Sequence, residues 1–316
     1  MKKYTHAWLA FMAVRRLQVA DIPVADRPYA ESLVEWFNGH RDDVVQGAWY
    51  PDAVFKDMST SHVLKISPSD TSTNKFKKLP GTYMSFKNGE KSSLFKKSFE
   101  VDPADNLPDR CESIAHSVVD NLKVQKREQK GSPVVPASNH LALLLFMLSH
   151  YVADAHMPLH CDKRNFSAHG DVHGDIEGEW EKMVKRFYKC DLKRERFQYD
   201  PEGYPLPDEK REKEFQSSPL AAVVSEVSGR KFEVSYGGTN KNVWDFMSAV
   251  CQYSYLLSYE LFPIVIDPAT VTPNNWKSLI TVKFDDITGD VLSDAIDSIA
   301  RVWLHVWRRY VIWAKD

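Results

Sequence analysis

Apolar residues recur every three or four positions along most of the chain, which is the spacing of amphipathic helices. This pattern predicts seven helices, over residues 7–17, 29–37, 105–124, 140–155, 172–188, 243–261 and 287–314. Asn38-Gly39 and Pro158 supply stop signals for the second and fourth helices, and Ser138-Asn139 is placed to cap the start of the fourth. The sequence therefore predicts an all-α fold.

The segments between the predicted helices are long and polar. Residues 67–100 are rich in Lys and Ser, and residues 193–216 mix charged residues with proline. Residues 231–236 alternate in the manner of a strand ahead of Gly237-Gly238, which predicts one short hairpin. No internal repeat or domain-dividing linker interrupts the 316 residues. We therefore expect residues 1–316 to form a single helical domain with long loops.

Composition and charge narrow the class of protein. The 41 Lys and Arg against 43 Asp and Glu give a formal net charge of −2, which argues against a dedicated duplex-DNA-binding protein but not against a local basic groove. The four cysteines contain no CxxC pair, so free thiols are expected. The apolar stretch at residues 7–14 is about half the length of a membrane span, and no cleavage site follows it. The expected location is cytoplasmic, or secreted if the chain is incomplete at its amino end.

Histidines and carboxylates concentrate in one stretch of the chain. Five of the eleven histidines fall between positions 150 and 173, interleaved with Asp and Glu. His150 and Asp154 lie four residues apart on a predicted helix, so both project from one face. A proline turn can then return His160 to the same cavity, and His173 and Glu177 form a second pair with the same spacing.

Imidazole and carboxylate groups together are the ligands expected of zinc, and less specifically of iron or manganese. A single HxxxD pair would usually be part of a solvated helix face. Two such pairs beside an apolar helix do not fit a solvated helix face. The apolar helix is expected to be buried, and a buried charge must be paired or bound to metal. We therefore expect a metal site here. His6, Asp52 and His62 are further donors, although each by itself is more often structural or exposed than a ligand.

Together these residues resemble the zinc-dependent phospholipase C family and its relatives, the trinuclear-zinc single-strand-specific nucleases. The resemblance rests on the segments GAWYPD, HYVADAHMPLH and HGDIE with His6 and His62, and it covers the first 62 residues and roughly residues 138–188. It implies an all-helical fold that cleaves phosphodiesters with a three-zinc cluster. Glu177 favours the phospholipase branch, because the nucleases usually have Asp at this position. The segment GAWYPD favours the same branch.

The resemblance also implies which residues hold each ion. By position, the ligands fall into three sets: His160, His173 and Glu177; Asp52, His62, His150 and Asp154; and His6 with Asp154 as a bridge. Both families usually add the amine of an amino-terminal Trp, whereas this chain begins with Met1, five residues before His6. The resemblance implies that residues 67–130 are an insertion relative to both families.

The expected function is a zinc-dependent phosphodiesterase of the phospholipase C type, with two to three zinc ions. Asp52 would be both a ligand and the group that orients or deprotonates the attacking water. The substrate would be a phospholipid or another phosphodiester, with peripheral membrane contact through aromatic residues such as Trp49, Tyr50 and Phe55. One alternative is a nuclease or nucleotidase acting on single-stranded nucleic acid, for which residues 75–78, 96–97 and 123–130 could supply cations. The other is a non-catalytic helical protein with a structural metal.

Overall fold

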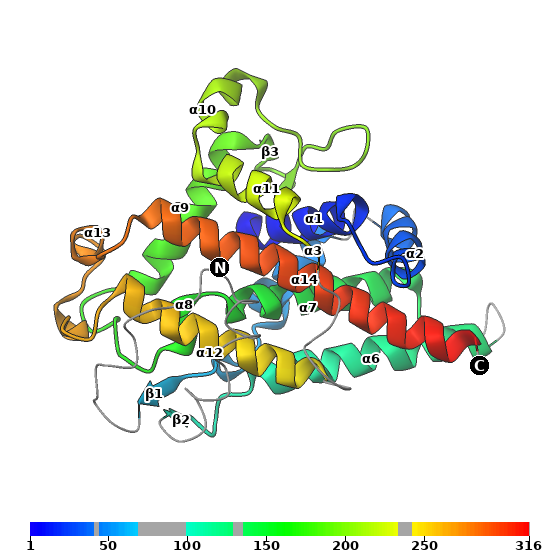
Figure 1. Cartoon of the computed structure of the whole chain (residues 1–316), viewed down its shortest axis with the longest axis horizontal. Helices are drawn as coiled ribbons and strands as arrows, with labels where there is room; N and C mark the ends of the chain where they lie inside the picture. Colours follow the sequence, from blue (N-terminus) through cyan, green and yellow to red (C-terminus); the bar gives the residue numbers. More distant parts are fainter. Residues whose placement is uncertain (41–43, 69–98, 129–134, 233–241, 316) are drawn as a thin grey trace.

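The computed structural model describes residues 1–40, 44–68, 99–128, 135–232 and 242–315, and these are predominantly helical, which confirms the all-α prediction (Figure 1). The longer helices are α1 (Lys3–Val19), α2 (Arg27–Asn38), α6 (Leu107–Arg127), α7 (Ser138–Ala155), α9 (Val172–Phe187), α11 (Pro219–Gly229), α12 (Val243–Leu261) and α14 (Phe284–Lys315). Shorter helices are α3 (Val44–Tyr50), the π-helix η2 (Pro51–Phe55), η3 (Ser59–Ser61), α8 (Pro158–Cys161), η5 (Glu209–Arg211), α10 (Glu212–Gln216), η6 (Pro268–Thr270) and α13 (Trp276–Leu279).

Each of the seven predicted segments is a helix, with modest shifts at the ends, whereas α3 and α11 were not expected. The start of α7 also differs from the prediction. The helix begins at Ser138, and the preceding Ala137 has no side chain that could cap it. The side chains of Ser138 and Asn139 bond instead to Gln125 and His40, each at 3.0 Å. The predicted Ser138-Asn139 cap is therefore wrong.

Strands are few among the described residues. β1 (Ile66–Pro68) pairs antiparallel with β2 (Phe99–Val101), and β3 (Cys190–Asp191) pairs antiparallel with β4 (Arg196–Phe197). Neither ladder is the hairpin predicted at residues 231–236, most of which lie outside the described part of the chain. The first ladder matters for the site, because Ile66 also forms a parallel bridge to Asp162, just after α8.

The core is organised around α7 and α14. α7 packs against α1, α3, α6, α12 and α14, and α14 also packs against α1, α2, α6 and α11 (Figure 1). The rings of Phe37, Phe146 and Trp303 join three of these helices, with centroid distances of 4.8 to 5.4 Å. The Trp303 indole also donates to the carbonyl oxygen of Leu145 at 2.7 Å. These contacts fix the turn of α7 that leads into His150.

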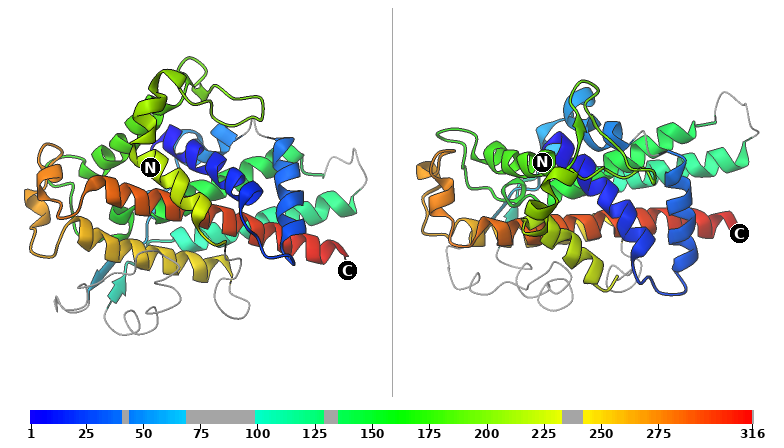
Figure 2. Two further views of the ribbon diagram at one scale, coloured as in Figure 1. Left: turned by 45° about the horizontal axis from the view of Figure 1, so that its top comes forward. Right: turned by 90° about the horizontal axis from the view of Figure 1, so that it is seen from above.

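The amino end of α1 lies in the middle of the helical body, whereas α14 ends at its edge (Figure 2). α1 is buried on nearly all sides, as the apolar run at residues 7–14 requires. Its first residues therefore reach the region where α7, α8 and α9 meet. None of the described helices is long and apolar enough to cross a membrane. All four cysteines are free thiols, as predicted.

Candidate metal centre

The structure brings the eight predicted donors into one site. They come from six separate segments: α1 (His6), η2 (Asp52), the residue after η3 (His62), α7 (His150, Asp154), α8 (His160) and α9 (His173, Glu177). Three groups of these side chains have ligand atoms that all lie within 4.8 Å of one another: His6, Asp52 and His150; His62, His150 and Asp154; and His160, His173 and Glu177. Each group could hold a metal ion.

The group on α8 and α9 is the simplest. His160 Nε2 lies 2.7 Å from His173 Nε2, and Glu177 Oε1 lies 2.7 Å from His173 Nε2 and 3.6 Å from His160 Nε2. Ligand atoms around a tetrahedral zinc are roughly 3.3 Å apart, given bond lengths of about 2.0–2.1 Å. Asp171 caps α9 by accepting the Gly174 amide at 2.8 Å, which fixes the helix turn that carries His173.

The second group gathers around Asp154 near the end of α7. Its Oδ2 atom lies 2.9 Å from His62 Nδ1 and 3.1 Å from His150 Nε2, and the two imidazole nitrogens are 3.2 Å apart. Asp52 Oδ1 lies 3.6 Å from His150 Nε2 and 3.8 Å from His62 Nδ1. The four residues that the resemblance assigns to one ion are thus neighbours in the structure.

The backbone of α3 holds the His150 ring. Its Nδ1 atom donates to the carbonyl oxygen of Ala48 at 2.9 Å, which directs Nε2 toward the other donors of the cluster. α3 can come this close because Gly47 has no side chain. A Cβ atom at Gly47 would lie 2.3 Å from Phe146 Cβ and 3.0 Å from the carbonyl oxygen of Leu143.

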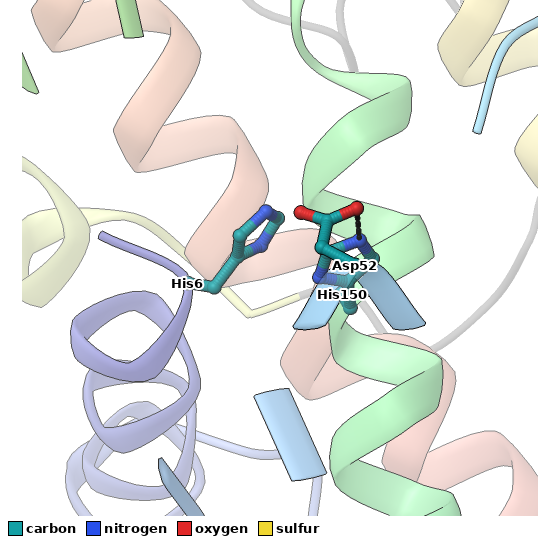
Figure 3. Close-up of side chains that lie close together, drawn as sticks. All are labelled: His6, Asp52 and His150. Atoms are coloured by element: carbon teal, nitrogen blue, oxygen red, sulfur yellow. Dashed lines mark ion pairs between the residues drawn. The ribbon is translucent and has the colours of Figure 1, made fainter. Parts of the chain in front are cut away.

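The third group contains His6, Asp52 and His150 (Figure 3). The rings of His6 and His150 stack with centroids 3.9 Å apart, and the figure shows the Asp52 carboxylate paired with His150 beside them. His6 Nε2 also lies 3.4 Å from Oδ1 of Asp154, the residue expected to bridge toward it. His6 is therefore close to both of its possible partners, Asp52 and Asp154.

The Met1 amine lies inside the same cluster. It is 2.9 Å from Asp154 Oδ1 and 2.5 Å from Glu177 Oε1, and the Met1 side chain is fully buried. Burial lowers the pKa of this amine, but the two carboxylates outweigh that effect and raise it to about 10. The amine therefore forms buried ion pairs with both Asp154 and Glu177.

The electrostatics of the site favour the metal-binding form of four of its groups. Burial lowers the pKa of His6 to about 4 and that of His160 well below its usual range. Nearby cations hold the pKa of Asp154 and Glu177 far down despite their burial. His150 is the exception: burial lowers its pKa, but the carboxylates of Asp154 and Asp52 raise it to about 10.

Buried polar atoms without partners support a metal in this cluster. Both ring nitrogens of His6 and Nδ1 of His160 are buried and form no hydrogen bond. Leaving a buried donor or acceptor without a partner costs about 1–3 kcal/mol. Neutral imidazole nitrogens and ionised carboxylates are the ligands that zinc and related metals take, so the residues present fit a bound metal.

A polar contact that the sequence did not reveal braces one wall of the site. The Tyr151 hydroxyl donates to Asp57 at 2.5 Å, and Arg110 pairs with the same carboxylate. The Tyr151 ring lies against His62 and His150, with centroids 5.1 and 5.4 Å away. Nothing in the spacing of Asp57, Arg110 and Tyr151 signals this contact, because each comes from a different element.

The cluster opens into a cavity of about 620 Å³. Its wall includes the Met1 end of the chain, the segment that follows Asp52, and the segment from Asp162 to Ser167. Asp52 is the most accessible of the carboxylates in the cluster, with 54% of its side chain exposed, against 2% for Asp154 and 5% for Glu177. A ligand in the cavity would therefore meet Asp52 first.

The comparisons with known proteins add no relative. No family model matches the chain, and neither curated proteins nor solved structures show a significant similarity to it. Only the residues of the site itself therefore indicate its chemistry.

Proposed function

We propose that this protein is a zinc-dependent phosphodiesterase of the phospholipase C type. The observation that carries the proposal is the convergence of eight imidazole and carboxylate side chains from six segments on one cavity. A single closed tetrahedral zinc site uses four ligands, so this set is too large for one structural ion. It suits a cluster of ions with positions left open toward the cavity, which is the arrangement that catalysis needs.

Zinc is the metal that best suits these donors. The cluster combines imidazoles with carboxylates and contains no thiolate, and its two closest groups have ligand atoms 2.7 to 3.6 Å apart. Imidazole-rich sites select zinc, copper or iron over magnesium and calcium, which prefer oxygen ligands. When bound, zinc makes water lose its proton near pH 7 and polarises phosphoryl oxygens.

Asp52 is the residue that acts on the attacking water in this proposal. Its accessible carboxylate faces the cavity beside His62 and His150. Burial raises the pKa of Asp52, but His150 outweighs this effect and lowers the pKa to about 2, so the carboxylate is ionised and can accept a hydrogen bond. The hydrogen bond from His150 to the Ala48 carbonyl fixes the imidazole ring. The fixed ring in turn holds the Asp52 carboxylate in one position.

The segment that follows Asp52, part of which lines the cavity, favours a lipid substrate. Val54, Phe55 and Met58 are 51%, 57% and 64% exposed, on the segment that follows Asp52. Lys56, on the same segment, lines the cavity. Exposed apolar side chains next to an active-site opening suit contact with a membrane surface. Trp49 and Tyr50, also expected at this rim, are half-buried.

A single-strand nuclease or nucleotidase is the second candidate function. Phe166 is an aromatic side chain that lines the cavity, and bases stack on such rings. Phe166 is, however, buried and stacked on Phe262 with centroids 4.8 Å apart, so its ring is already covered. The basic clusters at residues 75–78 and 96–97 lie outside the described residues, and the described part of the third cluster, residues 123–128, does not line the cavity. The lipid substrate is therefore the better-supported alternative.

The test compares two Asp→Asn variants of the zinc-loaded protein on bis(p-nitrophenyl) phosphate. Asp52→Asn should lose about 10²–10⁴-fold in rate, because it removes the group that orients or deprotonates water. Asp120→Asn, at an exposed site on α6, is the control and should match the parent. Zinc content is measured for each variant by mass spectrometry. Full activity of Asp52→Asn with its zinc retained would overturn the role of Asp52, and an inactive zinc-loaded parent would overturn the function.

A further inference from the structure

Three lysines line the cavity beyond the metal cluster: Lys56, Lys65 and Lys163. We call them the basic wall. Lys65 and Lys163 are brought together by pairing between the segment after His62 and the segment after His160. The Leu64 amide donates to the His160 carbonyl at 3.3 Å, and the Lys163 amide donates to the Ile66 carbonyl at 3.1 Å. The backbone pairing that joins the segments of His62 and His160 therefore also places Lys65 and Lys163 in the basic wall.

Lys65 is the innermost lysine of the basic wall. Its side chain is half-buried, and its ammonium group donates to the carbonyl oxygen of Leu159. Among the described residues, no carboxylate lies within ion-pair distance of this ammonium group. Burial lowers the pKa of Lys65, and Cys161, Asp162 and Asp105 offset this effect only in part, because none of them forms an ion pair with the ammonium group. An anionic ligand in the cavity would supply that counter-ion.

Lys56 is held in an unusual backbone conformation. It has φ 46°, in the left-handed region, and it ends the π-helix that carries Asp52. Among the described residues, only Lys56 and Glu195 have a positive φ without being glycine. Such strain is concentrated at functional sites, where the surrounding structure holds it in place. Here it turns the chain just after Asp52, and the lysine side chain becomes part of the cavity wall.

The other charges around the cavity leave the basic wall largely uncompensated. Asp57 is paired with Arg110, and Asp162 with Arg164 at 2.7 Å. Lys163 has a 3.7 Å contact with Asp102, but its own side chain remains 51% exposed. The carboxylates of the metal cluster would be neutralised by bound cations. The loaded cavity would therefore repel a cationic group and attract an anionic one.

We propose that the substrate carries a second anionic group, a phosphate, beyond the phosphodiester that is cleaved, and that Lys56 and Lys65 bind it. This inference rests on the proposed function and specifies its substrate class as phospholipids with a phosphorylated headgroup. Ser59, Asn165 and Ser167 also line the cavity and can bond to headgroup hydroxyls. A zwitterionic choline headgroup would instead place its ammonium group against the lysines.

The experiment compares phosphatidylinositol 4-phosphate with phosphatidylinositol, each diluted in the same uncharged detergent micelles. The two lipids differ only in the second phosphate. The zinc-loaded parent should prefer the phosphorylated lipid by about tenfold or more in kcat/KM, since a charge-assisted hydrogen bond supplies that much. The water-soluble headgroup diesters of both lipids, glycerophosphoinositol with and without the 4-phosphate, should show the same preference, which separates headgroup binding from attraction to a charged surface.

Lys65→Gln and Lys56→Gln should each lower this preference about tenfold. Lys56 is exposed, so its variant keeps the test valid if Lys65→Gln fails to fold. Lys123→Gln, on α6 and not among the residues that line the cavity, is the matched control and should keep the preference of the parent. Equal rates on the two lipids, no hydrolysis of either, or a preference that neither variant changes would overturn the headgroup inference. Failure of the parent on bis(p-nitrophenyl) phosphate would instead overturn the proposed function.

Discussion

The imidazole of His150 donates a 2.9 Å hydrogen bond to the backbone carbonyl of Ala48. This bond joins α7, which carries two donors of the cluster, to α3, which leads directly into the π-helix of Asp52. A π-helix is rare and is most often found at functional sites. The relative positions of Asp52 and His150 therefore depend on how closely α3 packs against α7.

Gly47→Ala tests that packing. The new Cβ would lie 2.3 Å from Phe146 Cβ, so α3 must move away from α7. We predict a loss of about 1–3 kcal/mol in the free energy of unfolding, together with weaker zinc binding. Urea unfolding and zinc titration measure the two effects. Gly289→Ala is the control, because a Cβ there meets nothing within 4 Å; it should be neutral or stabilise by up to about 1 kcal/mol. A Gly47→Ala protein as stable as its parent would contradict the close approach.

Tyr151→Phe removes the hydroxyl that donates to Asp57 but keeps the ring that packs on His62. We predict a loss of about 1–2 kcal/mol in unfolding free energy with unchanged zinc content, because no metal ligand is altered. Tyr50→Phe, at a half-buried position, should change stability by less than about 0.5 kcal/mol. If Tyr151→Phe lost zinc while Tyr50→Phe did not, Tyr151 would have a direct part in the metal site.

The Met1 amine offers a test that leaves every side chain intact. Adding one alanine ahead of Met1 converts this amine into a peptide amide, so the charged amine no longer lies against Asp154 and Glu177. We predict that the extended chain binds about one zinc ion fewer than the same chain without the alanine. Native mass spectrometry measures the difference. Equal zinc content in the two chains would show that the amine takes no part in metal binding.

Asp290 on α14 gives a pH prediction at a site away from the metal cluster. Burial, and then the carboxylates of Asp294, Glu226 and Glu260, raise the pKa of Asp290 to about 7, against the opposing effect of Arg230. The folded protein thus binds a proton that the unfolded chain releases at about pH 3.9. The stability contributed by protonated Asp290 is complete below pH 3.9 and is lost as pH rises toward 7.

Asp290→Asn cannot lose that proton, so it should gain stability relative to the parent as pH rises from about 4 to 7, and the difference should be constant above that range. Urea unfolding at pH 5 and pH 8, with both proteins in the same zinc concentration, measures the change. A stability difference that does not depend on pH would show that Asp290 is ionised in the folded state throughout this range.

The helices could be predicted from the sequence because their apolar spacing is local information. The pairs His150–Asp154 and His173–Glu177 follow from the same geometry, since residues four apart share a helix face. The short α3 escaped detection because its seven residues carry too little periodicity. The false cap at Ser138 arose because its hydroxyl bonds to Gln125, on another helix, and does not bond to the amides of its own helix.

The approach of distant segments could not be derived from the spacing of residues. Asp57 and Tyr151 are 94 positions apart, and the bond between them exists only after α6, α7 and η2 have packed. Lys65 reaches Leu159 in the same way, through the pairing of two extended segments. That Asp52 and His62 would join His150 was expected only from the resemblance to a family, and the structure places them 3.6 and 3.2 Å from its Nε2 atom.

Metal content is the most direct test of a zinc cluster in this protein. The measurement is inductively coupled plasma mass spectrometry on untagged protein, purified without chelator and then supplied with zinc. Two or three tightly held zinc ions per chain are expected from the three groups of donors around Asp154 and Glu177. One ion or none under these conditions would contradict the cluster, and the proposed phosphodiesterase activity would lose its chemical basis.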